Sequence, residues 1–221
     1  MRLIDRIFNI FAPYECVNCG QEGSVLCDVC ILDACPVVPS RCYRCKKLTK
    51  DFAICETCRR ASLLKHVWVR TEYQGLAKKL IYLLKFRSTR AAAVTIATLM
   101  AESLPVLPTE TVVVHVPTAT SRRRQRGFDH AKLVASHLSK ELNLQHEVLI
   151  GRKGQTRQVG AKREVRLRQL EDAYFVKKPL DGKSILLVDD IVTTGATLES
   201  AAKVLKAAGA KQINAVVFAQ K

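Results

Sequence analysis

Residues 185–198 read Ile185-Leu-Leu-Val-Asp-Asp-Ile-Val-Thr-Thr-Gly-Ala-Thr-Leu198. An apolar run ends in two adjacent carboxylates, and three threonines and a glycine follow. The run predicts a strand over 184–189 that is buried on both faces, and residues 195–208 predict a helix that stops at Gly209. Backbone N–H groups at the entry of such a helix, with hydroxyl groups beside them, are typical of a phosphate site.

The two carboxylates would repel a phosphate that touched them, so we expect them to bind a neighbouring group with hydroxyl donors. The vicinal diol of a ribose is such a group, because a pair of carboxylates can accept from both hydroxyls. The stretch therefore predicts a ribose 5-phosphate clamp, with the acids on the diol and the loop on the phosphate. Its residues are Asp189, Asp190, Thr193, Thr194, Gly195, Ala196 and Thr197. The alternatives are an ordinary capped helix after an acidic strand end, and an acidic Mg²⁺ pocket of the receiver type.

Strands and helices alternate over the rest of the chain from residue 66 onward. Further strands are predicted over 66–73, 111–116 and 213–219, and further helices over 76–87, 90–103 and 129–142. Residues 121–127 are predicted to be a basic loop, and residues 151–172 a mobile loop followed by a short helix. This alternation predicts a parallel α/β sheet.

Cysteine is confined to one short region, since all nine cysteines lie between residues 16 and 58. Eight of them form four CxxC pairs, which could supply two tetrahedral four-cysteine zinc sites. The ligands would be Cys16, Cys19, Cys27, Cys30, Cys42, Cys45, Cys55 and Cys58. Redox motifs and an iron–sulfur cluster fit this spacing less well. The pairs could combine sequentially or alternate in a cross-brace, and Cys35 is then a spare buried thiol.

The charge is strongly basic, at a formal +16. Two zinc ions on eight thiolates would reduce it to about +12. Residues 121–170 hold 13 Lys and Arg against 4 Asp and Glu. Such a segment is expected to meet an anionic partner or to be heavily solvated.

The N-terminal residues lack the features of a secretory signal, because Asp5, Arg6 and Asn9 interrupt the apolar stretch. They predict a short helix that docks on the protein's own body or touches a membrane surface. No apolar run reaches the roughly 18 residues of a membrane span. We therefore expect a cytoplasmic protein with reduced thiols. Its predicted domains are 1–62, a short helix plus the zinc module, and 63–221, the α/β sheet.

These motifs together resemble the ComF (ComFC/GntX) family of type I phosphoribosyltransferase-like proteins. Residues 188–198 are similar to the phosphoribosyl pyrophosphate (PRPP) signature of that fold. The CxxC pairs, the stretch Leu84-Lys-Phe-Arg87, and Val116-Pro117 with residues 122–128 also match, in the family's order and over nearly the whole chain. The resemblance implies a type I phosphoribosyltransferase fold, a parallel sheet flanked by helices, with a small N-terminal four-cysteine zinc module.

The resemblance also implies ligands and partners. PRPP would bind with Mg²⁺, and residues 117–127 would hold its pyrophosphate. Arginine suits that dense anion or a nucleic acid phosphate, and the candidates are Arg122, Arg123, Arg124, Arg126 and Arg166. Lys85 and Arg126 are the candidate catalytic residues, because both lie in matching stretches. This chain has Asp129-His130 where the family has Asn-Gln, and Gln169 where it has Asn, both on the acceptor or pyrophosphate side.

Two functions follow from the resemblance, both in natural transformation and DNA uptake at the inner face of the inner membrane. One is an enzyme that transfers ribose 5-phosphate from PRPP to an acceptor and releases pyrophosphate. The other is a non-catalytic protein that binds single-stranded DNA or senses PRPP. Base stacking would use aromatic residues, and the candidates are Tyr43, Trp68, Tyr73, Tyr82 and Phe128. The five scattered histidines are assigned structural roles.

Overall fold

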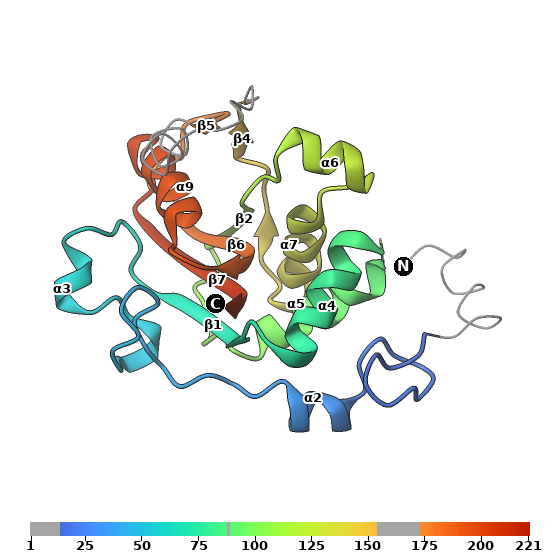
Figure 1. Ribbon diagram of the computed structural model, residues 1–221. Helices are drawn as coiled ribbons and strands as arrows, with labels where there is room; N and C mark the ends of the chain where they lie inside the picture. Colours follow the sequence, from blue (N-terminus) through green and yellow to red (C-terminus); the bar gives the residue numbers. More distant parts are fainter. Residues whose placement is uncertain (1–13, 88, 154–172) are drawn as a thin grey trace, which may run out of the picture.

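The computed structural model describes residues 14–87, 89–153 and 173–221 (Figure 1). Five strands form one sheet in the order β1-β7-β6-β2-β3, and every neighbouring pair is parallel. These strands are β1 Val67–Glu72, β2 Val112–His115, β3 Gln145–His146, β6 Ser184–Val192 and β7 Gln212–Gln220. The short strands β4 Ile150–Arg152 and β5 Tyr174–Val176 form a separate antiparallel pair. The predicted parallel sheet is confirmed.

Helices cover both faces of this sheet. Those of the sheet region are α4 Gly75–Phe86, α5 Arg90–Ala101, α6 Thr120–Arg126, α7 His130–Glu141 and α9 Ala196–Ala207. Figure 1 shows α4, α5 and α7 on one side of the sheet and α9 on the other. The cysteine region adds α2 Asp28–Ala34, a 3₁₀ turn η1 Lys50–Phe52, and α3 Glu56–Arg59.

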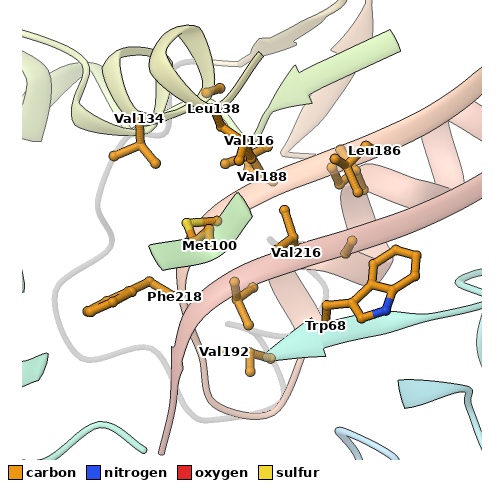
Figure 2. Packing of buried hydrophobic residues seen from close by; sticks show 14 of the residues in the cluster. Trp68, Met100, Val116, Val134, Leu138, Leu186, Val188, Val192, Val216 and Phe218 are labelled. Atoms are coloured by element: carbon orange, nitrogen blue, oxygen red, sulfur yellow. The ribbon is translucent and has the colours of Figure 1, made fainter. Parts of the chain in front are cut away.

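The core lies between the central strands and the helices on either face. Figure 2 shows Val134 and Leu138 of α7 and Met100 of α5 close to Val188 and Val216 of the sheet. All five side chains are at most 1% exposed. Since burial of one such side chain contributes about 1.5–3 kcal/mol, this layer holds the central strands, and therefore their C-terminal ends, in fixed relative positions.

Two predictions about local structure are wrong. Residues 120–126 form the helix α6 and not a loop, because arginine and glutamine are good helix formers. Gly127 ends this helix with a left-handed φ of 77°. Strand β6 continues through both aspartates to Val192, beyond the predicted end at 189. Strand β3 and the pair β4–β5 were not predicted. The predicted N-terminal helix lies outside the described residues, as does nearly all of the segment 151–172.

The cysteine region packs directly on the sheet. The indole N–H of Trp68 on β1 donates to Asp51 Oδ1 at 3.1 Å, and the N–H of Lys65 donates to the carbonyl of Ile213 at 3.0 Å. The chain from α2 to α3 runs past α4 and β1 along one edge of the molecule (Figure 1). Across the described ranges, no helix is both long and apolar enough to cross a bilayer. The division at residue 62 stays a prediction.

Candidate functional site

The turn between β6 and α9 lies at the C-terminal edge of the parallel sheet. Gly195 precedes α9 with a left-handed φ of 78°, a conformation that favours glycine. Thr193 and Thr194 are exposed, and the N–H of Ala196 donates to the Thr194 hydroxyl at 3.4 Å. A small hollow is lined by residues of this turn and by the end of β6: Asp189, Ile191, Val192, Thr193, Gly195, Ala196, Thr197 and Leu198.

This turn has the chemistry of an anion site. The first N–H groups of α9 have no acceptor within the helix, and the dipole of a 12-residue helix places partial positive charge there. The two exposed threonine hydroxyls add donors beside them. Ligands bind at this edge of open parallel sheets. The geometry is therefore compatible with the predicted phosphate loop, whose assignment stays a prediction.

Asp190 is the centre of a buried cluster of charges. Its Oδ2 forms an ion pair with Nζ of Lys85, from the last turn of α4. The same oxygen lies 3.3 Å from Nε2 of His130, the first residue of α7. The Asp190 side chain is only 8% exposed and that of Lys85 16%. The fold thus brings three distant parts of the chain to one carboxylate, including the candidate catalytic residue Lys85.

The two adjacent carboxylates have opposite electrostatic environments. Burial disfavours ionisation of Asp190, but the hydrogen bond from His130 and the charge of Lys85 outweigh it and lower its pKa. Burial and the neighbouring charge of Asp190 raise the pKa of Asp189. Asp189 is half-buried and lines the hollow. Asp190 is thus held as an anion by internal cations, whereas Asp189 faces the space where a ligand would lie.

Arg126 extends this cluster towards α6. Its Nη1 lies 3.1 Å from Nδ1 of His130, and its guanidinium stacks over the ring of Phe86 at 5.3 Å from the centroid. Burial lowers the pKa of Arg126, and the charge of Asp190 partly offsets that effect. His130 therefore contacts Arg126 on one side and Asp190 on the other, and Asp190 pairs with Lys85. The two candidate catalytic cations thus belong to one cluster.

His130 was not predicted to be part of the site. Its one signal in the sequence is the Asp129-His130 pair, which replaces Asn-Gln of the ComF family at the entry of α7. Asp129 caps that helix by accepting from the N–H of Lys132 at 3.3 Å. It also accepts from the Thr118 hydroxyl at 3.0 Å. The cap fixes the start of α7, so the imidazole of His130 is directed at Asp190.

The remaining arginines of α6 do not share one direction. Residues 122 and 126 are separated by four positions and lie on one face of the helix, whereas 123 and 124 lie on others. The charges of Arg122 and Asp190 both act on the pKa of Arg126. Arg122, Arg123 and Arg124 are exposed. The structure thus brings only Arg122 and Arg126 towards the aspartates. Arg166 lies outside the described residues.

The eight predicted metal ligands form two separate groups. Within each group the four sulfur atoms lie within 4.8 Å of one another, as tetrahedral zinc coordination requires. The groups are Cys16, Cys19, Cys27 and Cys30 (group 1), and Cys42, Cys45, Cys55 and Cys58 (group 2). The pairs therefore combine sequentially and not as a cross-brace. Cys35 is buried outside both groups.

In each cysteine group the pKa of one thiol is lowered and that of another is raised, the raised ones being Cys30 and Cys58. Burial opposes ionisation of Cys16, but hydrogen bonds from the backbone of Cys19 and Cys27 outweigh it and lower the pKa to about 6. The same balance lowers the pKa of Cys42 to about 7, with the backbone of Cys55 as the main donor. Thiolate is the form that binds metal. Each group could therefore hold one zinc ion.

Comparison with known proteins agrees with this geometry. The sequence model of the phosphoribosyl transferase domain family matches residues 126–221. The chain is 28% identical to the DNA utilization protein YhgH of Escherichia coli (strain K12) over 196 residues, which cover 78% of this chain and 86% of YhgH. It is also 38% identical to the competence protein ComFC of Bacillus subtilis (strain 168) over 96 residues, 42% of this chain and 38% of ComFC. These matches and the two cysteine groups support a phosphoribosyltransferase-like protein of the ComF type.

A solved structure is a more distant match to this chain. It is the glutamine PRPP amidotransferase from B. subtilis in complex with ADP and GMP. The TM-score is 0.42 at 14% identity, over 58% of this chain and 26% of that one. The parallel sheet, the family match and the two cysteine groups together give the fold class: a type I phosphoribosyltransferase fold with an N-terminal four-cysteine module.

Proposed function

We propose that this chain binds PRPP with Mg²⁺ at the C-terminal end of β6. The observation that carries the proposal is the exposed turn of Thr193 and Thr194, which adjoins Asp189 in one hollow. The 5-phosphate would accept from the N–H groups and hydroxyls of this turn. The ribose diol would donate to Asp189. Asp190 would position Lys85 and His130 behind the ligand.

The same cluster supplies the charges that phosphoribosyl transfer needs. In that reaction the bond between ribose C1 and pyrophosphate breaks, and negative charge accumulates on the departing pyrophosphate oxygens. Lys85 and Arg126 are cations held near Asp190 by the fold, and we propose that they stabilise this charge. Mg²⁺, bound mostly through ligand oxygens and water, would neutralise part of the pyrophosphate charge. The acceptor would attack C1 from the open side of the hollow.

The setting of this activity is proposed from the names of the relatives. YhgH is a DNA utilization protein, and ComFC is a competence protein. We propose that this chain acts in DNA uptake, in the cytoplasm beside the uptake machinery of the inner membrane.

A pyrophosphate-release assay tests the transfer step. The protein is incubated with PRPP and Mg²⁺ in the presence of single-stranded DNA or free nucleobases, and the rate of pyrophosphate release is measured. Loss of one preorganised charge at a transition state typically costs about 10²–10³ in rate, so we expect Lys85→Met to reduce release by that factor. Lys203→Met, an exposed lysine of α9, is the matched control. No release with any acceptor would remove the transfer step.

A second candidate function, binding of single-stranded DNA, is favoured by one surface. Tyr82 and Phe86 on α4 are 51% and 59% exposed, and their ring centroids lie 5.2 Å apart. Arg126 stacks on Phe86, so this aromatic pair adjoins the charge cluster. Tyr82 also lines a groove of about 530 Å³ together with Lys78 and Lys79. Exposed aromatics beside cations are the features with which proteins stack single-stranded bases.

The structure narrows the predicted stacking residues. Tyr43 and Trp68 are 1% and 2% exposed and cannot stack on bases. Tyr73 and Phe128 are half-buried and pack against the core. Tyr82 is therefore the one exposed candidate among the five, and Phe86 joins it. Binding of a fluorescent oligothymidylate tests this surface by anisotropy. Removal of a stacking ring costs about 1–3 kcal/mol per base, so Tyr82→Ala should weaken binding, whereas Phe175→Ala on β5, 43% exposed, should not. Equal affinities of the two variants would remove α4 from DNA binding.

A further inference from the structure

Tyr43, which lies between two cysteines of group 2, packs directly on the turn before α9. It is 1% exposed. A Cβ at Gly195 would overlap the Tyr43 ring and would lie 2.9 Å from its hydroxyl oxygen. Gly195 is thus needed both for its left-handed backbone and for the close approach of this ring. The contact joins the cysteine region to the middle of the turn 193–197.

The hydroxyl of Tyr43 reaches the first turn of α9. It donates to Glu199 Oε1 at 2.6 Å. The same carboxylate accepts from the hydroxyl of Ser62, and its Oε2 accepts from the N–H of Leu63 at 3.0 Å. Arg44 forms a longer ion pair with it at 3.8 Å. Glu199 therefore ties the start of α9 to the chain between the first two cysteines of group 2 and to the chain just after the last one.

The backbone of Tyr43 is also held at the end of the sheet. Gln220, the last residue of β7, donates from Nε2 to the Tyr43 carbonyl at 2.7 Å. Its Oε1 accepts from Arg41 Nη2 at 3.0 Å. The N–H of Lys221 donates to the carbonyl of Val192 at 3.0 Å, which registers β7 with the end of β6. Tyr43 thus has a fixed position relative to the strand from which the turn leaves.

The turn from Cys42 to Lys47, which carries two sulfurs of group 2, sets the backbone conformation at Tyr43. The N–H of Cys42 donates to the carbonyl of Lys47, and the N–H of Lys46 donates to the carbonyl of Cys42, both at 2.8 Å. A zinc ion on the group 2 sulfurs would lock this turn, because metal binding contributes directly to folding in small modules. Group 1 lies elsewhere, next to α4, where Lys79 Nζ lies 3.5 Å from the Val17 carbonyl. In the part of the chain that the structure describes, no hydrogen bond joins residues 16–30 to residues 193–199.

We propose that group 2, through Tyr43, positions the phosphate-binding turn 193–197, whereas group 1 has no part in binding PRPP. The inference rests on the proposed PRPP site. Tyr43 does not line the hollow itself, so it acts through Gly195 and Glu199 as a positioning residue. A zinc site on one part of the chain then governs the affinity of a phosphoribosyl site on another.

The test compares variants by two readouts. Calorimetry with PRPP and Mg²⁺ gives affinity, and hydrogen exchange of the amides 193–199 without ligand reports how firmly the turn is held. Cys45→Ser and Cys19→Ser are a matched pair, since both cysteines are exposed ligands of different groups. Tyr43→Phe removes the bond to Glu199 and retains the ring, and Tyr43→Leu removes both. Phe52→Leu, at a buried aromatic near group 2, controls for general destabilisation.

We expect Tyr43→Phe to weaken PRPP binding about tenfold, as for loss of one hydrogen bond to a charged group. Tyr43→Leu and Cys45→Ser should weaken it further and speed exchange at 193–199. Cys19→Ser and Phe52→Leu should leave both readouts unchanged.

Equal effects of the two cysteine variants, or of Tyr43→Leu and Phe52→Leu, would overturn the inference. If wild type binds no PRPP, the proposed function fails, and hydrogen exchange of the amides 193–199 alone decides whether Tyr43 positions the turn. Unchanged hydrogen exchange in Tyr43→Leu would then reject that role.

Discussion

Lys85, in the last turn of α4, forms a nearly buried ion pair with Asp190 of β6. His130 approaches the same carboxylate oxygen at 3.3 Å. Asp190 therefore has a structural task besides any contact with ligand, because it compensates cationic groups inside the protein. Its neighbour Asp189 forms no ion pair among the described residues, accepts from the N–H of Asp190 at 2.9 Å, and lines the hollow before α9.

This difference predicts unequal stabilities for two conservative variants. Asp190→Asn leaves Lys85 buried without its counter-ion, and breaking a buried pair typically costs about 3–5 kcal/mol. Asp189→Asn should be neutral or stabilising near neutral pH, since burial already disfavours its charge. Urea unfolding followed by the fluorescence of Trp68, the one tryptophan of the chain, measures both. Equal losses of stability would contradict the assignment of separate roles.

A pair of neighbouring histidines predicts that the folded protein loses stability at acid pH. Nδ1 of His115 lies 3.1 Å from Nε2 of His146, and burial lowers the pKa of His115 to about 4. An unfolded histidine has a pKa of about 6.5, so between these values only the unfolded state binds the proton. The contribution of neutral His115 to the free energy of unfolding is fully present above about pH 6.5. It is lost as the pH falls towards 4, by up to about 3 kcal/mol.

We expect His115→Asn to flatten the dependence of the unfolding free energy on pH between about 7 and 4.5. The groups that act on His115 are His146, Asp129, Lys132 and Lys177, and all remain in this variant. A slope identical to that of wild type would show that another group causes the acid sensitivity.

Metal analysis should give two zinc ions per chain, one for each four-sulfur group. Cys45→Ser and Cys19→Ser should each retain one ion, because the groups are separate. A cross-braced arrangement would instead make each cysteine variant disturb both ions. Removal of zinc by a chelator should unfold the cysteine region and leave the helices of the sheet region intact by circular dichroism.

Substitutions of the arginines of α6 should have different effects according to the helix face on which they lie. Arg122→Ala with Arg126→Ala removes the face near Asp190 and should weaken PRPP binding. Arg123→Ala with Arg124→Ala should spare PRPP and act on single-stranded DNA. Each lost phosphate contact flattens the log–log salt dependence by about 0.7, so this second pair should flatten it by about 1.4. Identical salt slopes in wild type and in the second pair would remove α6 from DNA binding.

The sequence was sufficient for four of the five strands of the sheet and for the cysteine groups, because their signals are local. Apolar runs mark buried strands, and CxxC spacing alone brings two sulfurs together. The same is true of the turn 193–197, where glycine and threonine follow a strand directly. Helix α6 was missed because its seven residues have no apolar face from which a helical period could be read.

The cluster around Asp190 could not be predicted in the same way. Lys85, Arg126 and His130 come from three helices that meet only after the sheet has formed. Likewise, no pattern in the sequence indicates that Tyr43 covers Gly195, since such contacts depend on how the cysteine region packs against α9. Long-range packing therefore decides which cations face the aspartates and which arginines point away.

The most direct test of the central claim is calorimetric titration of PRPP with Mg²⁺ into wild type, Asp189→Asn and Asp181→Asn. Asp181 is an exposed acid in the turn before β6 and is the matched control. The titration is carried out above pH 8, because the raised pKa of Asp189, about 8, leaves the carboxylate ionised only there. Loss of charge-assisted hydrogen bonds typically costs about 1.5–3 kcal/mol each. We predict that wild type and Asp181→Asn bind one PRPP with equal affinity and that Asp189→Asn binds about 10–100-fold more weakly. Failure of wild type to bind, or equal affinity in all three proteins, would contradict a phosphoribosyl site at the end of β6.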